Sequence, residues 1–310
     1  IVSRAAAPPN DLRIVVDAGN GAAGVYAWEL FQKLGYLTFQ LNCEPDDTYP
    51  HYFPNPSEKT AREALKRAVG TAGIDADIGL GFDGDGDRLG VVDGQGRDIW
   101  ADRVLMILAE YYLRRHPGAT VVFDVKCTKA LIESVVRSGG RPLMWKTGHS
   151  YIKERMKTEN AVLAGERSGH IFINDENRGY DDALYAAAVL LKIMAERKQK
   201  VEELLKHFPA YETSPEIHIS CCDQEKYERV ENLQRYFINA YGRENVCQIN
   251  GARVEFPQFK GWALVRASSN LPELVMIAEA DGRENLRRLE ALLREELIKN
   301  GIKEQWQNIE

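Results

Sequence analysis

Residues 79–92 read GLGFDGDGDRLGVV, so an apolar stretch leads directly into an acidic loop. The apolar residues 77–82, DIGLGF, predict a buried strand, and the loop follows its carboxyl end. Asp83, Asp85 and Asp87 alternate with glycines, and alternate positions of an extended loop direct side chains to the same side. Bare carboxylates so close together repel one another, so we expect a cation among them.

The pattern of this loop favours magnesium over other acidic sites. A cage of hard oxygen ligands suits Mg²⁺. An EF-hand loop needs Gly at its sixth position and Glu at its twelfth, but counting from Asp83 places Arg88 and Gly94 there. A phosphatase loop of the DxDxT type needs a Thr, which is absent, and a solvated acidic turn is the remaining alternative. Arg88 either pairs with the aspartates or reaches an anionic substrate, and both stay open.

The residues before this loop alternate between strand-like and helix-like patterns. Residues 12–17, LRIVVD, and residues 36–41, YLTFQL, are apolar runs that predict strands, with a helical pattern between them. Thr60 and Glu63 have the spacing of a capping box, which predicts the start of the next helix. Alternation of this kind predicts an α/β domain with a largely parallel sheet.

The rest of the chain repeats this architecture once and then changes. Strand-like and helix-like stretches alternate again from residue 98, whereas a hairpin pattern at Asn250 and Gly251 and long amphipathic stretches follow residue 209. We therefore expect an α/β fold with two tandem related α/β domains that have mixed sheets, over residues 1–97 and 98–208. A smaller C-terminal α+β domain over residues 209–310 completes the prediction.

The composition limits the classes of protein that fit. The 310 residues carry a net charge of −6, which argues against a general binder of nucleic acid or of membrane surfaces. The five cysteines form no CxxC pair and fit reduced thiols, so we expect a cytoplasmic protein, and we expect it to be a monomer. The chain starts without Met and without the pattern of a signal peptide, so we expect the cut end of a longer chain.

The segment GERSGH, residues 165–170, carries three side chains suited to binding a polyol. Glu166 can accept two hydroxyl hydrogen bonds, Ser168 can donate or accept one, and His170 can act on a proton or a phosphate. A polar turn between two strands is the alternative.

The segment RASSNLP, residues 266–272, predicts a loop that binds phosphate. Arg266 offers a planar fork to a phosphate group, and neutral donors follow it at Ser268, Ser269 and Asn270. A surface turn without a ligand is the alternative.

Two further segments place basic side chains directly after apolar strands. Lys126 lies in VKCT, and Lys146 and His149 lie in WKTGHS. We expect each of them near the end of a sheet, where a solvated or structural role is the alternative to a functional one.

These loops, in this order, resemble the α-D-phosphohexomutase superfamily. DGDGDR at residues 83–88 carries the strongest resemblance, and GERSGH and RASSNLP follow in the expected order. VVDAGNGAAG, FDVKCTKALIE, GGRPLMWKTGHSYIK and KGWALVRAS extend the likeness over nearly the whole chain, in particular to the bacterial bifunctional phosphomannomutase/phosphoglucomutases.

The resemblance implies a reaction and its cofactors. A phosphoserine enzyme passes its phosphoryl group to the 1- or 6-phosphate of mannose or glucose, a bisphosphate intermediate forms, and the other phosphate returns to the serine. One Mg²⁺ ion offsets the charge of the transferred group. Glucose 1,6-bisphosphate is the implied activator. A phosphoglucosamine mutase and a metal-dependent phosphatase are the alternative enzymes.

The resemblance also implies the roles of individual residues. Asp83, Asp85 and Asp87 hold the Mg²⁺ ion, while Glu166 and Ser168 bind the 3- and 4-hydroxyls of the sugar. Four residues hold the non-reacting phosphate: Arg266, Ser268, Ser269 and Asn270. Four others line the cleft, namely Arg88, Lys126, His149 and His170. Of these, Arg88, Lys126 and His170 are the catalytic candidates, with Lys126 and His170 handling protons.

The chain departs from the family pattern in two places. The family's phosphate loop reads RxSNTxP, whereas Ser269, Asn270 and Leu271 precede Pro272 here. The TASHNP-like loop that carries the phosphorylated serine in the family's first domain is absent from the 310 residues. We therefore expect domains two to four of a four-domain mutase, inactive without a serine domain that is truncated, cleaved or supplied by another chain. A non-catalytic fragment that only binds phosphosugar is the alternative.

Overall fold

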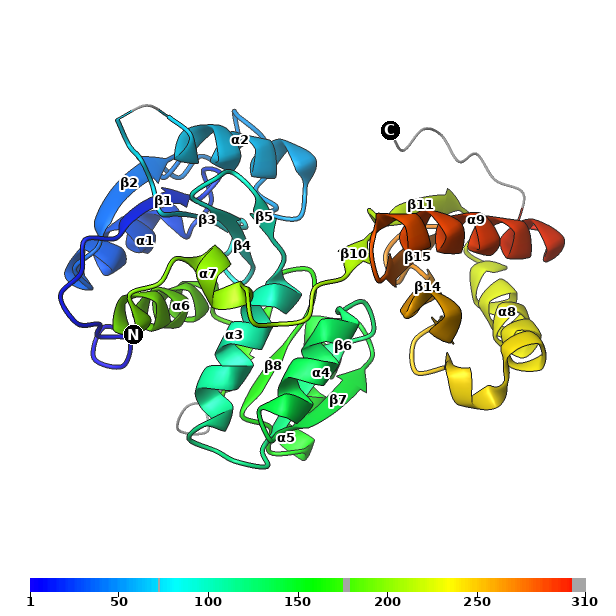
Figure 1. Ribbon diagram of the computed structural model, residues 1–310. Coiled ribbons are helices and arrows are strands. Elements are labelled where there is room, and N and C mark those ends of the chain that lie inside the picture. The colour runs from blue at the N-terminus through cyan, green and yellow to red at the C-terminus, as the bar shows by residue number, and fades with distance from the viewer. Residues whose placement is uncertain (72, 175–178, 303–310) are drawn as a thin grey trace. The chain divides into compact units, whose positions relative to one another are not determined.

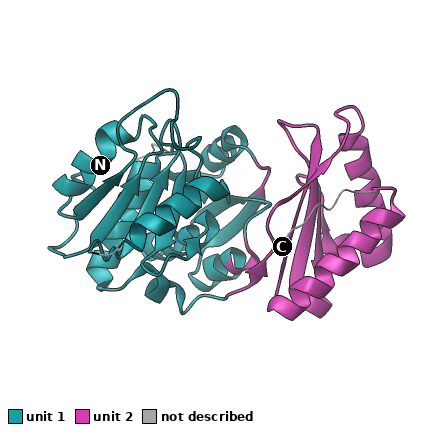
Figure 2. Cartoon of the chain, turned by 90° about the horizontal axis from the view of Figure 1, so that it is seen from above, with its two compact units in different colours: residues 1–127, 131–144, 148–209 teal, residues 128–130, 145–147, 210–310 magenta. Residues whose placement is uncertain are grey.

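The structure is a computed structural model that describes residues 1–71, 73–174 and 179–302. The described chain divides into two compact units (Figure 2). The first unit comprises residues 1–127, 131–144 and 148–209, and the second comprises residues 128–130, 145–147 and 210–310. The predicted division into three domains stays a prediction, since the first unit contains the first two of them.

The first sheet belongs to the first unit and is mixed. Its strands run in the order β2-β1-β3-β4-β5 (Figure 1), with the bounds β1 (Arg13–Asp17), β2 (Leu37–Leu41), β3 (Ile78–Phe82), β4 (Leu89–Asp93) and β5 (Asp98–Ile99). β1 is parallel to β2 and β3, whereas β4 is antiparallel to both of its neighbours. The mixed sheets predicted for the α/β domains are confirmed: β2, β1 and β3 form the parallel part of the first sheet, and β4 and β5 pair in antiparallel fashion. Residues 83–88 alone join β3 to β4, too short a connection for the crossover that a parallel partner requires.

Two helices pack on this sheet. α1 (Gly24–Lys33) buries Ala27 and Phe31, and α2 (Lys59–Val69) buries Leu65 and Val69. The capping box predicted at residues 60 and 63 was wrong. α2 begins two residues earlier than that pattern requires, behind the extended N-cap residue Glu58, which makes no side-chain cap. The Glu63 carboxylate pairs with Lys66 at 3.0 Å instead.

The second sheet repeats the plan of the first within the same unit. Its strand order is β7-β6-β8-β9, with the bounds β6 (Thr120–Asp124), β7 (Arg141–Trp145), β8 (Leu163–Gly165) and β9 (Ile171–Ile173). β6 and β8 are parallel, and β8 and β9 form an antiparallel hairpin around residues 166–170. Both sheets therefore end a run of parallel strands with a hairpin, and each hairpin carries one of the predicted functional loops.

The helices that accompany the second sheet differ in how deeply they are buried. They are α3 (Ala101–Leu113), α4 (Lys129–Arg137), α5 (His149–Thr158), α6 (Ala183–Arg197) and α7 (Val201–Leu205). Asp182 caps α6 by accepting a hydrogen bond from the Tyr185 backbone N–H at 2.8 Å. Among the residues that the structure covers, no helix combines the length and the apolar character needed to cross a membrane.

The second unit contains an antiparallel sheet with two long helices. The strand order is β10-β15-β14-β13-β12, with β11 beside β15, and the bounds are β10 (Glu212–Thr213), β11 (Ile217–Ser220), β12 (Val246–Cys247), β13 (Ala252–Phe256), β14 (Gly261–Ala267) and β15 (Glu273–Ala280). α8 (Lys226–Tyr241), α9 (Arg283–Lys299) and two short 3₁₀ helices, Arg243–Asn245 and Pro257–Phe259, complete the unit. Phe237 and Leu293 of the helices share one core with Val265 of β14, so the neighbouring Arg266 points to the other face of the sheet. The predicted α+β character of this region is confirmed.

Substituting Gly24 tests how closely α1 approaches the chain after β2. A Cβ atom at Gly24 would lie 2.1 Å from the carbonyl oxygen of Cys43, so Gly24→Ala forces the backbone apart. We expect a loss of about 2 kcal/mol or more in the free energy of unfolding, measured as a lower midpoint of thermal and urea unfolding. Gly70→Ala is the matched control, because Gly70 has φ −79° and its Cβ would meet nothing closer than 3.5 Å. Equal midpoints for the two variants would contradict this packing.

Candidate functional site

The acidic loop, residues 83–88, folds around the carboxylate of Asp83. Its Oδ1 accepts backbone hydrogen bonds from Gly86 at 3.1 Å and from Asp87 and Arg88 at 3.0 Å each. Gly86 adopts φ +81°, a conformation that favours glycine. The loop is therefore a tight turn and not the extended strand on which the sequence argument relied. One ligand oxygen each from Asp83, Asp85 and Asp87 nevertheless lies within 4.8 Å of the others, because the turn brings the three side chains together.

The electrostatics of this turn favour a bound cation. Asp83 is only 7% exposed. Burial, with the charges of Asp87 and Asp85, raises its pKa to about 6, against the lowering effect of the hydrogen bond from the Arg88 N–H. A divalent ion removes this repulsion, and three carboxylates offer the hard oxygen ligands that Mg²⁺ prefers. The donor set fits Mg²⁺, whose binding here stays a prediction.

The GERSGH loop, residues 165–170, forms the turn between β8 and β9. Glu166 is 2% exposed, and its Oε1 accepts a hydrogen bond of 2.6 Å from the backbone N–H of Gly148. Burial, then the charge of Asp124, raises the pKa of Glu166, while the charges of His170 and Lys126 act to lower it. Ser168 is partly exposed. The loop thus presents a buried acceptor beside a more accessible hydroxyl, as binding of a polyol requires.

Backbone hydrogen bonds join the acidic loop to the GERSGH loop. The Leu89 N–H donates to the Gly169 carbonyl oxygen at 3.0 Å, and Arg88 forms an isolated antiparallel bridge with His170. The Arg88 Nε donates to the His170 Nε2 at 3.0 Å and lies 3.4 Å from Asp83 Oδ2. The sequence left two roles open for Arg88, and in this structure it contacts both an aspartate and the histidine.

His170 lies between acidic side chains and is 4% exposed. Its Nδ1 is 3.2 Å from Asp181 Oδ2 and 3.5 Å from Asp87 Oδ2. Because Arg88 donates to Nε2, that nitrogen is unprotonated and the proton lies on Nδ1, facing the two carboxylates. Burial acts to lower the pKa of His170, but Asp181, Asp87 and Glu166 outweigh it and raise the pKa above its usual value.

Asp181 is the site residue that the sequence argument missed. It lies directly before the capping residue of α6, and its Oδ2 is a buried atom without a hydrogen-bond partner. A signal was present in the sequence, since Asp181 and Asp182 are adjacent and only one of them can cap the helix. The pairing with His170 became visible only when β9 and the start of α6 were brought together.

The predicted basic residues of the first unit lie near the GERSGH loop. The Lys126 charge acts on Glu166, and Lys126 itself is buried. The His149 ring stacks on the His170 ring with centroids 5.4 Å apart and an interplanar angle of 20°. Lys146 belongs to the second unit, where the neighbouring Thr147 N–H donates to Asn250 Oδ1 at 3.2 Å.

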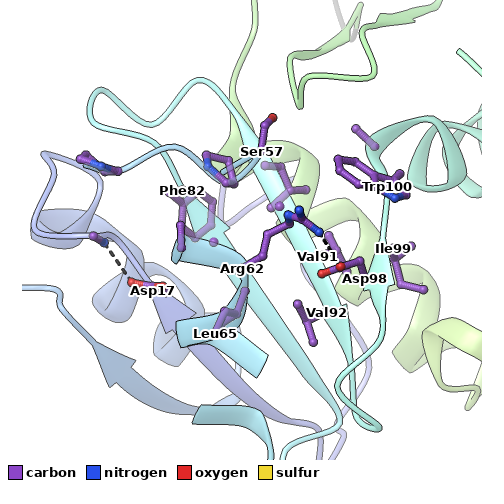
Figure 3. A pocket seen from close by; sticks show the side chains of 18 of the residues that line it. Asp17, Ser57, Arg62, Leu65, Phe82, Val91, Val92, Asp98, Ile99 and Trp100 are labelled. Carbon is purple, nitrogen blue, oxygen red and sulfur yellow. Dashed lines mark hydrogen bonds and ion pairs between the residues drawn. The ribbon is translucent and has the colours of Figure 1, made fainter. Parts of the chain in front are cut away.

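A narrow apolar hollow lies beside α2 and the end of the first sheet (Figure 3). Leu65, Phe82 and Trp100 contribute to its wall, and Arg62 pairs with Asp98 within it at 2.6 Å. Its cavity volume is about 30 Å³, room for about two water molecules. The acidic triplet is not part of its wall, so we do not assign the predicted chemistry to it.

The RASSNLP loop, residues 266–272, joins β14 to β15 in the second unit. Arg266 and Ser268 are buried, whereas Ser269 and Asn270 are exposed. Arg266 Nη2 donates to Ser269 Oγ at 3.3 Å, and Ser268 Oγ accepts from the Leu271 N–H at 3.2 Å. These bonds hold the predicted phosphate donors in one turn despite the departure from the family pattern. Phosphate binding by this turn stays a prediction.

Comparison with protein families gives two adjoining matches. The model of phosphoglucomutase/phosphomannomutase α/β/α domain II matches residues 1–96, and that of domain III matches residues 100–211. The phosphomannomutase/phosphoglucomutases of Pseudomonas putida and Pseudomonas aeruginosa are 45% and 44% identical to this chain over 288 and 287 residues. A phosphoglucomutase of Neisseria meningitidis is 40% identical over 279 residues. These alignments cover 90–93% of this chain but only 60–61% of the relatives' length.

Solved structures give the same result. A phosphoglucomutase/phosphomannomutase family protein from Burkholderia thailandensis has a TM-score of 0.85 and 37% identity, covering 98% of this chain and 64% of that chain. The N-acetylphosphoglucosamine mutase of Aspergillus fumigatus, solved with GlcNAc-6P and magnesium, has a TM-score of 0.68 but 15% identity, covering 96% of this chain and 68% of that chain. The second likeness speaks for the fold alone.

Lowering the pH should weaken Mg²⁺ binding by the acidic loop. Below the raised Asp83 pKa of about 6, the ion must displace a proton before it binds. We expect the Mg²⁺ Kd to rise about tenfold for each pH unit below 6, measured by calorimetry.

The same raised pKa of Asp83 predicts that the metal-free chain loses stability as the pH rises from about 4 to 6, because the unfolded state then binds fewer protons than the folded state.

Two variants complete this experiment. Asp85→Asn should abolish the Mg²⁺ signal, and Asp47→Asn, a change of the same kind at an exposed position, should leave it intact. A Kd that does not change with pH would show that Asp83 is not a ligand.

Asp181→Asn tests the contact with His170. Removing the carboxylate that lies 3.2 Å from Nδ1 takes away a charge that favours the imidazolium, so the pKa of His170 should fall. The pKa is measured by following the ring C–H signals in NMR spectra over pH. Asp47→Asn serves again as the control. An unchanged titration of His170 in Asp181→Asn would contradict the contact.

Proposed function

The chain belongs to the phosphoglucomutase/phosphomannomutase family, and from this we propose that it forms the metal-, sugar- and phosphate-binding part of a phosphohexomutase. Such an enzyme interconverts the 1-phosphate and the 6-phosphate of mannose or glucose. The chain spans about 60% of the length of the relatives that it matches, so the activity of a whole enzyme is part of the proposal.

One observation carries this proposal: the acidic loop and the GERSGH loop are hydrogen-bonded into a single site. Leu89 and Gly169 pair at 3.0 Å, and the Arg88 and His170 side chains meet at 3.0 Å. A cation-binding turn therefore lies beside a buried carboxylate and a histidine. This combination suits transfer of a phosphoryl group between hydroxyls, which needs charge compensation, sugar positioning and a group that moves a proton.

The residues of this site take separate roles in the proposal. Asp83, Asp85 and Asp87 hold Mg²⁺, which when bound offsets the negative charge of the phosphoryl group. Glu166 accepts hydrogen bonds from two sugar hydroxyls, and Ser168 supplies a further polar contact. His170 receives the proton of the attacking hydroxyl on Nε2. For this step, Nε2 gives up the hydrogen bond from Arg88 and contacts the substrate hydroxyl instead.

The non-reacting phosphate is bound by the RASSNLP loop in this proposal. Arg266 supplies a charged fork, and Ser268, Ser269 and Asn270 supply neutral donors. The Arg266–Ser269 hydrogen bond of 3.3 Å supports this role, because it holds the guanidinium beside the other donors of the turn.

The phosphorylated serine is supplied from outside these 310 residues in this proposal. No TASHNP-like motif is present in the sequence. Glucose 1,6-bisphosphate is the expected activator of the complete enzyme. In a second candidate function, the chain only holds the phosphosugar. All five cysteines are free thiols, which supports the cytoplasmic location that we expect.

Binding of hexose phosphates by this chain tests the site without requiring turnover. Glu166→Gln removes a buried charged acceptor, so we expect the Kd for glucose 6-phosphate and mannose 6-phosphate to rise about tenfold or more. Calorimetry in the presence of Mg²⁺ measures both. Glu154→Gln, at an exposed position of α5, is the matched control. Equal affinities of the two variants would contradict the proposed sugar site. Tighter binding of glucosamine 6-phosphate than of the other two sugars by the unsubstituted chain would contradict the proposed sugar.

Transfer of radiolabel separates the two candidate functions. Labelled glucose 1,6-bisphosphate should leave this chain unlabelled when it is alone. Addition of a serine-bearing first domain should give labelled serine and mutase turnover if the chain is part of an enzyme. Sugar binding without turnover in that mixture supports a fragment that only binds phosphosugar. Radiolabel on this chain when it is alone would overturn the proposal that the phosphorylated serine lies outside it. Release of free phosphate would indicate a phosphatase.

A further inference from the structure

A second pocket lies in the first unit and is lined by residues of α3 and α6. These two helices pack together (Figure 1). The cavity volume of the pocket is about 300 Å³, about the lower end of the range for small-molecule sites. Three tyrosines and three basic residues contribute to its wall, together with Val189. None of these residues belongs to the candidate site described above.

Aromatic side chains make up one part of this tyrosine pocket. Tyr111 and Tyr112 of α3 are buried, and their rings meet edge to face with centroids 5.5 Å apart. Tyr185 and Val189 face the pocket from α6. Val189 is 2% exposed, so the floor is apolar and well packed. Such a surface accepts the flat face of a ring.

Positive charge gathers in the same pocket. The Arg115 guanidinium lies 4.0 Å from the Tyr111 ring centroid and donates to the Tyr111 carbonyl oxygen at 3.2 Å, and no carboxylate pairs with it in the described chain. Lys192 donates to the carbonyl oxygen of Arg4 at 3.1 Å, and its side chain is 20% exposed.

One acidic side chain of α6 lies close to Lys192. Glu196 lies 4.0 Å from Lys192, at the limit of an ion pair. Arg4, Arg115 and Lys192 are the basic residues that line the pocket. Lys192 is the partly buried cation and gains most from a bound anion, because little water is present to screen the pair, whereas Arg115 is exposed at the rim.

We propose that this pocket binds a small organic phosphate that carries a ring. The phosphate contacts Lys192 and Arg115, which both donate hydrogen bonds to anionic oxygens. The ring packs on Tyr111 and Tyr185. The available volume suits one monophosphate ester and excludes a folded peptide segment.

Phenyl phosphate is the probe that tests this inference, with inorganic phosphate and phenol as its two halves. Calorimetry at low salt should give a phenyl phosphate Kd tighter than that of either half. Lys192→Gln and Arg115→Gln should each weaken phenyl phosphate binding by about tenfold or more. Arg114→Gln is the matched control, because Arg114 directly precedes Arg115, is equally exposed, and pairs with Glu110 without lining the pocket. This variant should bind as the unsubstituted chain does.

The phosphate loop proposed for the second unit offers a competing location, and Arg266→Ala tests it. Loss of phenyl phosphate binding in Arg266→Ala, together with unchanged binding in Lys192→Gln, would overturn the inference. Equal affinity for inorganic phosphate and phenyl phosphate would overturn the role of the tyrosines. Thermal unfolding of each variant identifies a weakened affinity that results from misfolding. If Lys192→Gln is unfolded, the phenyl phosphate affinity of Arg115→Gln, a variant at the rim of the pocket, tests the inference in its place.

Discussion

The site depends on one backbone contact, the pairing of the acidic loop with the GERSGH loop. The Leu89 N–H reaches the Gly169 carbonyl oxygen at 3.0 Å. Gly169 adopts φ +112°, and a Cβ atom there would lie within 3.0–3.1 Å of Leu89 backbone atoms and of Arg88 Cβ. A larger residue would therefore separate the two hairpins. Their separation would in turn break the contact between Arg88 and His170, on which the rest of the site is built.

The charges of the site follow from this contact. Asp83, Asp87 and Asp181 surround one histidine and one arginine within a few ångströms. The burial that raises the pKa of Asp83 also strengthens each attraction, since little water is present to screen it. The negative groups outnumber the positive ones, and a divalent cation restores the balance. This excess of negative charge connects the geometry of the turn with the chemistry that we propose.

Several parts of the fold and of the candidate site could be predicted from the sequence because they depend on local patterns. Apolar runs identified β1, β2 and β3. Other parts depend on distant residues. The start of α2 was misassigned because Thr60 and Glu63 match a capping pattern while Glu63 pairs with Lys66 instead. The antiparallel direction of β4 follows from the short connection of residues 83–88, which leaves room only for a hairpin.

By itself, the sequence determined the kind of chemistry available: an acidic triplet, a polyol-binding loop and a basic loop, each recognisable from residue types a few positions apart. Only the tertiary structure decided which of these act together. It joined residues 88 and 170, 82 positions apart, and it gave His170 an unexpected partner in Asp181. The physical reason is that the residue types within one loop are given by neighbouring positions of the sequence. Distances between side chains of different loops depend on how the hairpins of the two sheets pack against each other, and a local sequence pattern does not predict that packing.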